Sequence, residues 1–221
     1  MKLYKYMPDK FVSGFVDKGL LLFRNLTYFR QYEDIRRGDP LEGFHRDNPE
    51  NDVTLSCPKT GRILAKGDFS FLNSTNTDLI FVFCMSRILK DELYKEFETN
   101  TCIEITEPLE FTKRVHFSIK KLLSPHKNGL LAGDVNYYRD NAPVGFDVKE
   151  PKNLAFAKGN HYEHQKEFRL VFGTTKRAFD LKQQIVVNRS YDFLKEAKNG
   201  QPKEKLVKIG CLRDITKVHR I

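Results

Sequence analysis

The run Leu-Ile-Phe-Val-Phe-Cys-Met-Ser at residues 79–86 is the most hydrophobic stretch of this chain. Apolar side chains follow one another here without alternation, so both faces of an extended segment must be covered by other elements. We therefore predict a buried strand at the centre of a sheet. Ser86 ends the run, where its hydroxyl can face a cleft beside the sheet.

A second stretch, residues 161–172, combines titratable groups with an alternating pattern. Phe168, Leu170 and Phe172 would point to one face and the residues between them to the other, which is typical of a strand with one buried face. Gln165 and Glu167 would project from the same side of an extended chain into an adjacent cleft. A carboxylate held there can stabilise a developing positive charge or accept a hydrogen bond from a sugar hydroxyl. The same pair also fits a strand edge that carries solvated charges.

The composition bounds the class of protein. The chain has 221 residues, of which 40% are hydrophobic, and it includes 18 Phe and 9 Tyr. This apolar content suffices for one core, and we predict a single domain over residues 1–221. With 13 Gly, 9 Pro and no repeat, the sequence disfavours disordered and fibrous classes. The formal net charge of +9 favours a polyanionic partner such as RNA, DNA, an acidic protein or an anionic cofactor.

Cysteine usage and hydropathy indicate the compartment. The four cysteines lie far apart and form no Cys-x-x-Cys pair, so a zinc site is poorly supported. The first residues lack the apolar segment of a signal peptide, and no apolar run approaches the length of a membrane span. We expect a cytoplasmic protein without a membrane partner and with no metal.

The remaining patterns predict short elements. Apolar residues at helical spacing favour helices at residues 10–20, 87–97 and 191–197. Further strands are expected at residues 3–6, 20–23, 101–105, 114–119, 134–138, 184–187 and 206–212. Turn-forming residues favour loops at residues 28–45 and 139–160 and a short hairpin around Gly61. Because strands outnumber helices and few helices can connect parallel strands, we predict an α+β fold with mostly antiparallel sheets.

The loop predicted at residues 28–45 mixes aromatic and charged side chains. It is either a solvated connector or a binding loop held on a scaffold, and its aromatic residues favour the second interpretation. Aromatic faces beside Arg36 and Arg37 are suited to stacking a base or a nicotinamide ring while the guanidinium groups reach phosphates.

The order of these pieces resembles the ADP-ribosyltransferase superfamily, which includes mono-ADP-ribosylating and nucleic-acid-modifying toxins. The resemblance rests on the opening strand and helix at residues 4–23, on the central strand ending in Ser86, and on Gln165-Lys166-Glu167 at the start of a late strand. It implies an ADP-ribosyltransferase-like fold and NAD as co-substrate. It also implies a toxin or phage-defence effector, which would need an antitoxin or immunity protein.

The resemblance further implies roles for the matched residues. Glu167 would bind the nicotinamide-ribose hydroxyl and stabilise the oxocarbenium ion as nicotinamide leaves, and Gln165 would orient the acceptor. In the family, Gln at that position goes with acceptors other than arginine. Together with the charge of +9, this points to a nucleic acid, RNA or DNA, as the acceptor.

The cofactor-binding positions depart from the family pattern. The first strand of the family usually supplies an Arg or a His to NAD, whereas this chain offers Lys5 and Tyr6. Arg36 and Arg37 are further candidates, because they can reach in from the loop. Ser86 is the residue retained from the Ser-Thr-Ser signature of the family, and we include it in the NAD site.

Two other functions fit the same residues. In a metal-free ribonuclease, His161 or His164 would be the general base. A metal site would require the segment before Phe168 to be helical, since the two histidines converge on a helix and diverge on a strand. A non-enzymatic, basic nucleic-acid-binding protein is the third possibility, although dispersed lysines more often mark a solvated surface.

Overall fold

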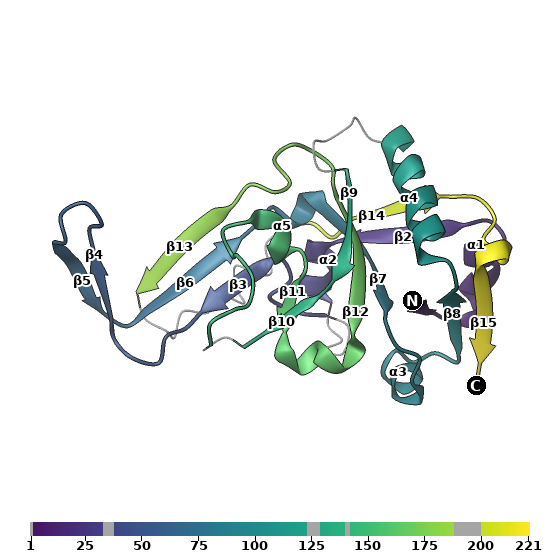
Figure 1. Cartoon of the computed structure of the whole chain (residues 1–221), viewed down its shortest axis with the longest axis horizontal. Helices are drawn as coiled ribbons and strands as arrows, with labels where there is room; N and C mark the ends of the chain where they lie inside the picture. Colours follow the sequence, from purple (N-terminus) through teal and green to yellow (C-terminus); the bar gives the residue numbers. More distant parts are fainter. Residues whose placement is uncertain (1, 33–37, 123–128, 140–141, 188–199) are drawn as a thin grey trace.

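The computed structural model of the chain describes residues 2–32, 38–122, 129–139, 142–187 and 200–221. Within these residues, eight strands form the main sheet. They are β1 (Leu3–Tyr6), β2 (Leu20–Asn25), β7 (Ile80–Ser86), β8 (Thr101–Ile105), β9 (Leu130–Asp134), β12 (Glu167–Gly173), β14 (Glu204–Lys208) and β15 (Thr216–Arg220). All the strand pairs of this sheet are antiparallel, in the order β14-β2-β7-β1-β8-β15, and β12 and β9 follow on the other edge of β7 (Figure 1).

Strand β7 is the centre of the sheet, as the hydrophobic run predicts. On one edge, β12 pairs with its whole length, from Ser86 opposite Glu167 to Ile80 opposite Gly173. On the other edge, β2 pairs only with Phe81 and Val82, and β1 only with Ser86. The sheet therefore splits beside the middle of β7, between β1 and β2.

Three smaller sheets complete the strands of the described residues. The first contains β3 (Phe44–Asp47), β6 (Phe69–Ser74) and β13 (Lys182–Val187); the second is the hairpin of β4 (Val53–Ser56) and β5 (Ile63–Gly67); the third pairs β10 (Asn136–Tyr138) with β11 (Ala157–Gly159) in parallel. Figure 1 shows β3, β6 and β13 extending away from the main sheet, with β4 and β5 at the far end. The hairpin expected around Gly61 is thus confirmed.

The helices are short, with one exception. They are α1 (Val12–Val16), α2 (Leu26–Gln31), α3 (Asp91–Glu96), α4 (Pro108–Leu122) and α5 (Pro151–Leu154), with 3₁₀ turns η1 (Asp9–Phe11), η2 (Thr77–Leu79), η3 (Asn160–Gln165) and η4 (Arg213–Ile215). Helices α1 and α4 pack on one face of the main sheet and enclose the largest core, which is rich in Phe. The α+β class with mostly antiparallel sheets is confirmed.

The strand predicted at residues 114–119 is wrong, because this segment belongs to helix α4. Val115 and Ile119 are buried, but Phe117 between them is 62% exposed, as a helical and not an extended chain requires. The buried set of Phe111, Val115 and Ile119 has a spacing of four. Apolar residues at 115 and 119 fit both the period of a strand and that of a helix. Phe111, four positions before Val115, was the signal that favoured the helix.

Other boundaries differ from the prediction. The loop expected at residues 28–45 begins inside α2, whose amino terminus is capped by Asn25 Oδ1 accepting from Tyr28 N at 3.0 Å. The loop expected at residues 139–160 contains α5 and β11, and the strand expected at 206–212 ends at Lys208. Strands β6 and β15 were not expected, and the helix predicted at 191–197 lies outside the described residues.

In the described part of the chain, no helix has the length and apolar character needed to cross a membrane.

Candidate active site

A cavity of about 560 Å³ opens where the main sheet splits. Strands β1, β2 and β7 contribute residues on both sides of the split, and Gln165, Glu167 and Lys158 join them from the chain segments beside β7. The volume lies within the roughly 300–1,000 Å³ of small-molecule and cofactor sites. The cavity at the split in the sheet is therefore the candidate ligand site.

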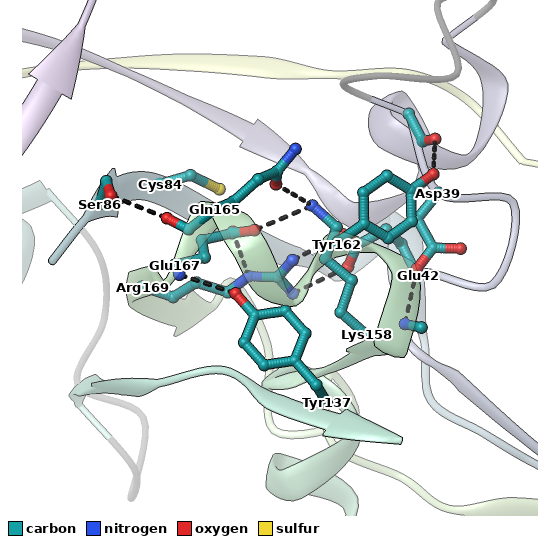
Figure 2. A network of polar contacts seen from close by, with 12 residues as sticks. Asp39, Glu42, Cys84, Ser86, Tyr137, Lys158, Tyr162, Gln165, Glu167 and Arg169 are labelled. Atoms are coloured by element: carbon teal, nitrogen blue, oxygen red, sulfur yellow. Dashed lines mark hydrogen bonds and ion pairs between the residues drawn. The ribbon is translucent and has the colours of Figure 1, made fainter. Parts of the chain in front are cut away.

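Four buried charged side chains, Glu42, Lys158, Glu167 and Arg169, contact one another (Figure 2), and the first three of them line this cavity. Glu167 Oε1 accepts from Arg169 Nε at 2.6 Å, and Glu167 Oε2 accepts from Lys158 Nζ at 2.9 Å. The guanidinium of Arg169 also donates to both carboxylate oxygens of Glu42, at 2.6 and 2.8 Å. Each of the two carboxylates contacts at least one cation. Burial nevertheless raises the pKa of Glu42, and the buried carboxylate of Asp39 adds to this effect.

The local sequence explains how these groups meet. The alternation of β12 directs Glu167 and Arg169 to the face opposite Phe168 and Leu170, which lie in the main core. Lys158 comes from β11, which continues into the η3 turn. Glu42 comes from the turn before β3, where Asp39 Oδ1 accepts from Leu41 N at 2.9 Å. Three separate chain segments therefore supply one cluster.

The environment keeps Glu167 ionised. Burial alone would raise its pKa, but the charges of Arg169 and Lys158 outweigh burial and hold the pKa of Glu167 well below its usual range. Cys84, on the neighbouring strand, is a smaller polar contribution that also lowers the pKa of this carboxylate. Burial and the charge of Glu167 raise the pKa of Cys84, so its thiol stays protonated. Glu167 thus lines the cavity as an ionised carboxylate that is paired with Arg169 and Lys158.

Gln165 and Glu167 come together, but not through an extended chain as expected. Gln165 is the last residue of η3, and Lys166 has a left-handed backbone with φ 43° before β12 begins. Both side chains nevertheless contact Lys158 Nζ, which donates to Gln165 Oε1 at 3.1 Å. Gln165 Nε2 donates to Glu96 Oε1 at 2.6 Å, so both ends of this amide are fixed.

The cofactor-binding candidates of the first and central strands also line the cavity. Lys5 Nζ donates at 2.7 Å to the carbonyl oxygen of Cys84, which is on the stretch of β7 beside the split. The Ser86 hydroxyl donates to the carbonyl oxygen of Gln165 at 2.7 Å, and the Tyr6 hydroxyl accepts from Lys90 N at 2.8 Å. These contacts hold the walls of the cavity in place.

Arg36 and Arg37 lie outside the described residues. The aromatic residues of the same segment do line the cavity: Tyr28, Phe29 and Tyr32. The rings of Tyr28 and Tyr32 are stacked with centroids 5.4 Å apart, and the guanidinium of Arg24 lies 4.2 Å from the centroid of Tyr28. Arg24, which the sequence did not single out, is a cation at this aromatic wall.

The histidines of the ribonuclease hypothesis, His161 and His164, are not among the residues that line the cavity. The segment before Phe168 is helical, yet His164 Nδ1 is 2.9 Å from the carbonyl oxygen of His161 and His164 Nε2 is 2.8 Å from Glu96 Oε2. Both ring nitrogens of His164 therefore have protein partners. In the described ranges, no group of three or more His, Cys, Asp or Glu side chains is arranged to hold a metal ion.

Sequence reasoning missed three of the four clustered charges. Arg169 had a usable signal, because it shares the buried strand and the face of Glu167, and a buried Arg needs an acid. Lys158 and Glu42 had none, since both lie in segments that read as loops and reach Glu167 only through the tertiary fold.

Comparison with protein-family models, with curated proteins and with solved structures gives no match for this chain.

Proposed function

We propose that this chain is an ADP-ribosyltransferase that uses NAD as co-substrate and modifies a nucleic acid, as a toxin or phage-defence effector would. The observation that carries the proposal is the ionised carboxylate of Glu167, buried at a cavity large enough for a cofactor. An ionised carboxylate in a pocket of low dielectric is suited to a reaction that develops positive charge beside it.

The residues of the cavity fit the chemical groups of NAD. Lys10 and Arg24 line it and carry the positive charge that a diphosphate requires. The aromatic side chains of Tyr28, Phe29 and Tyr32 line the cavity, and aromatic side chains of this kind can pack against a heteroaromatic ring. Glu167 can accept a hydrogen bond from a ribose hydroxyl: a carboxylate has roughly four acceptor positions, and Arg169 and Lys158 use two of them.

In the proposed reaction, NAD would supply a ribose–nicotinamide bond whose cleavage makes the ribose electron-poor. Glu167 would lie beside that ribose and stabilise its positive charge. Arg169 and Lys158 would keep the carboxylate ionised and fixed in position, and Lys158 would hold Gln165 in a constant orientation towards the acceptor.

The test is incubation of the protein with NAD labelled in its ADP-ribose part, together with separate pools of RNA, DNA and protein. We expect nicotinamide release and transfer of label to a nucleic-acid pool. The substitution Glu167→Gln should lower the rate by roughly 10²–10³ or more, as removal of a transition-state-stabilising group does.

The matched control is Glu163→Gln, because Glu163 is an exposed acid four positions earlier that pairs with Lys166 outside the cavity. This variant should keep full activity. Cleavage of RNA without NAD would instead identify a nuclease. Nucleic-acid binding with neither reaction would identify a non-enzymatic binding protein. Either result would overturn the proposal.

A further inference from the structure

The β4–β5 hairpin, residues 53–67, is a separate structural feature at the opposite end of the molecule from β15 (Figure 1). None of its residues belongs to a hydrophobic core cluster of the described chain. Isolated two-stranded hairpins are only marginally stable in water. A projecting hairpin that adds nothing to a core therefore calls for a partner.

The charge of the hairpin selects that partner. Residues 53–67 contain Lys59, Arg62 and Lys66 and no acid. All three cations are exposed, and none has an ion-pair or hydrogen-bond partner among the described side chains. Asp52 and Asp68 flank the hairpin at its base, whereas Lys59 and Arg62 flank its tip. The charged residues of the distal part are thus all cations, which is complementary to a polyanion.

The shape and the apolar residues select among polyanions. Two paired strands lie about 4.8 Å apart, and the major groove of B-form DNA, roughly 12 Å wide, admits a two-stranded β-ribbon. The major groove of duplex RNA is deep and narrow, and side chains do not read it. Ile63 and Leu64 are 64% and 66% exposed, and such side chains suit contact with thymine methyl groups in the major groove.

From these observations we propose that the β4–β5 hairpin is a DNA-binding arm that inserts into the major groove of double-stranded DNA. Lys59, Arg62 and Lys66 contact phosphates, and Ile63 and Leu64 contact base edges. This binding goes beyond the proposed transfer reaction, does not require NAD, and is tested without it.

The experiment measures binding of the intact protein to a mixed-sequence DNA duplex by fluorescence anisotropy at several salt concentrations. The wild type is compared with a variant carrying Lys59→Ala, Arg62→Ala and Lys66→Ala. Loss of three phosphate contacts should reduce the magnitude of the slope of log K against log salt by about 2.7. Between about 50 and 200 mM salt, the affinity of the variant should therefore fall by a factor about 40 times smaller than that of the wild type.

The matched control carries Lys113→Ala, Lys120→Ala and Lys121→Ala, three exposed lysines on α4. It has the same charge change and should keep the wild-type slope. Equal losses in the two triple variants would overturn the proposal, because they would show attraction to net charge alone. Preference of the wild type for duplex RNA or single strands over duplex DNA would also overturn it.

A footprint inside the chain gives a second measurement. Cys57 lies at the tip of the hairpin, where its carbonyl oxygen accepts from Gly61 N at 2.8 Å, and Cys211 is exposed at a distant site. Bound duplex DNA should slow alkylation of Cys57 and leave that of Cys211 unchanged. Equal rates with and without DNA, under conditions in which the duplex is bound, would place the binding surface elsewhere and overturn the proposal.

Discussion

Lys158 joins the polar side chains that line the cavity. Its ammonium donates to Glu167 and to Gln165, and it lies 4.3 Å from the centroid of the Tyr162 ring. The side chain is 4% exposed, so water cannot replace these contacts. A buried charge is tolerated only while its partners remain, and removal of one partner leaves the other uncompensated.

Lys158→Met should therefore destabilise the fold by roughly 3–5 kcal/mol, the usual cost of breaking a buried ion pair. Urea unfolding measures this change. The double substitution Lys158→Met and Glu167→Gln should be less destabilised than the two single changes added together, by roughly 0.5–3 kcal/mol. Lys18→Met, at an exposed lysine, should leave stability unchanged. Additive single effects would show that Lys158 and Glu167 are not coupled.

The lowered pKa of Glu167 predicts how stability depends on pH. An ordinary glutamate titrates at about 4.3 in an unfolded chain, whereas the cations beside Glu167 hold its folded pKa below that value. Protons therefore bind the unfolded chain more readily. The stabilisation from this group is present above about pH 5 and is lost as the pH falls from about 4.3 towards the folded pKa.

Glu167→Gln should thus flatten the acid side of the stability curve relative to the wild type, as measured by urea unfolding between about pH 3 and pH 7. Glu163→Gln, at an exposed acid, should leave the acid side as steep as in the wild type. If Glu167→Gln and the wild type lose stability in parallel as the pH falls, then Glu167 is not held ionised by its neighbours.

At the scale of elements, helix α4 shows how tertiary packing separates two residues of the same type. Phe111 is fully buried in the main core, while Phe117 is 62% exposed on the opposite side of the helix. Phe111→Ala should destabilise the protein by roughly 3–5 kcal/mol, and Phe117→Ala should change stability by less than about 0.5 kcal/mol. Thermal unfolding of the two variants measures the difference. Similar effects would contradict the helical assignment.

The elements that the sequence predicted well are those with long, consistent patterns. The run at residues 79–86 and the alternation at 167–172 became β7 and β12, because continuous apolar character and a period of two allow few other structures. The expectation of one buried face was wrong for β12, in which all seven residues are buried. Short elements such as α2, α5 and β11 were not predicted, since a few residues carry little periodic signal. The cap by Asn25 was the main local sign of α2.

The site was predictable only in the part that one strand carries. Glu167 and its partner Gln165 could be singled out from their own segment, and both line the cavity. Lys158 and Glu42 reach the same cavity from segments nine and more than a hundred positions away, through contacts that no local pattern encodes. The sequence also did not predict the turn at Lys166, which has a positive φ, because lysine is not a residue that marks such a conformation.

At the scale of the whole molecule, the fold separates two surfaces. The cavity lies in the split of the main sheet, while the hairpin of residues 53–67 lies beyond the smaller sheet of β3, β6 and β13 (Figure 1). The split arises because β1 and β2 each cover only part of one edge of β7. For the transferase proposed above, such a separation would allow one surface to hold the polymer and another to hold the small co-substrate.

This separation predicts the result of removing the hairpin. Val53 and Gly67 are paired opposite each other, so residues 53–67 can be replaced by a short Gly-Ser turn without moving the flanking chain. Because the hairpin contributes to no core cluster, the midpoint of thermal unfolding should stay within about 2 °C of the wild type. The nicotinamide release expected from the proposed function should be unchanged when NAD is supplied alone. The affinity for duplex DNA should fall as it does in the variant with Lys59→Ala, Arg62→Ala and Lys66→Ala. A deletion that abolishes nicotinamide release while the protein stays folded would show that the two surfaces are not independent.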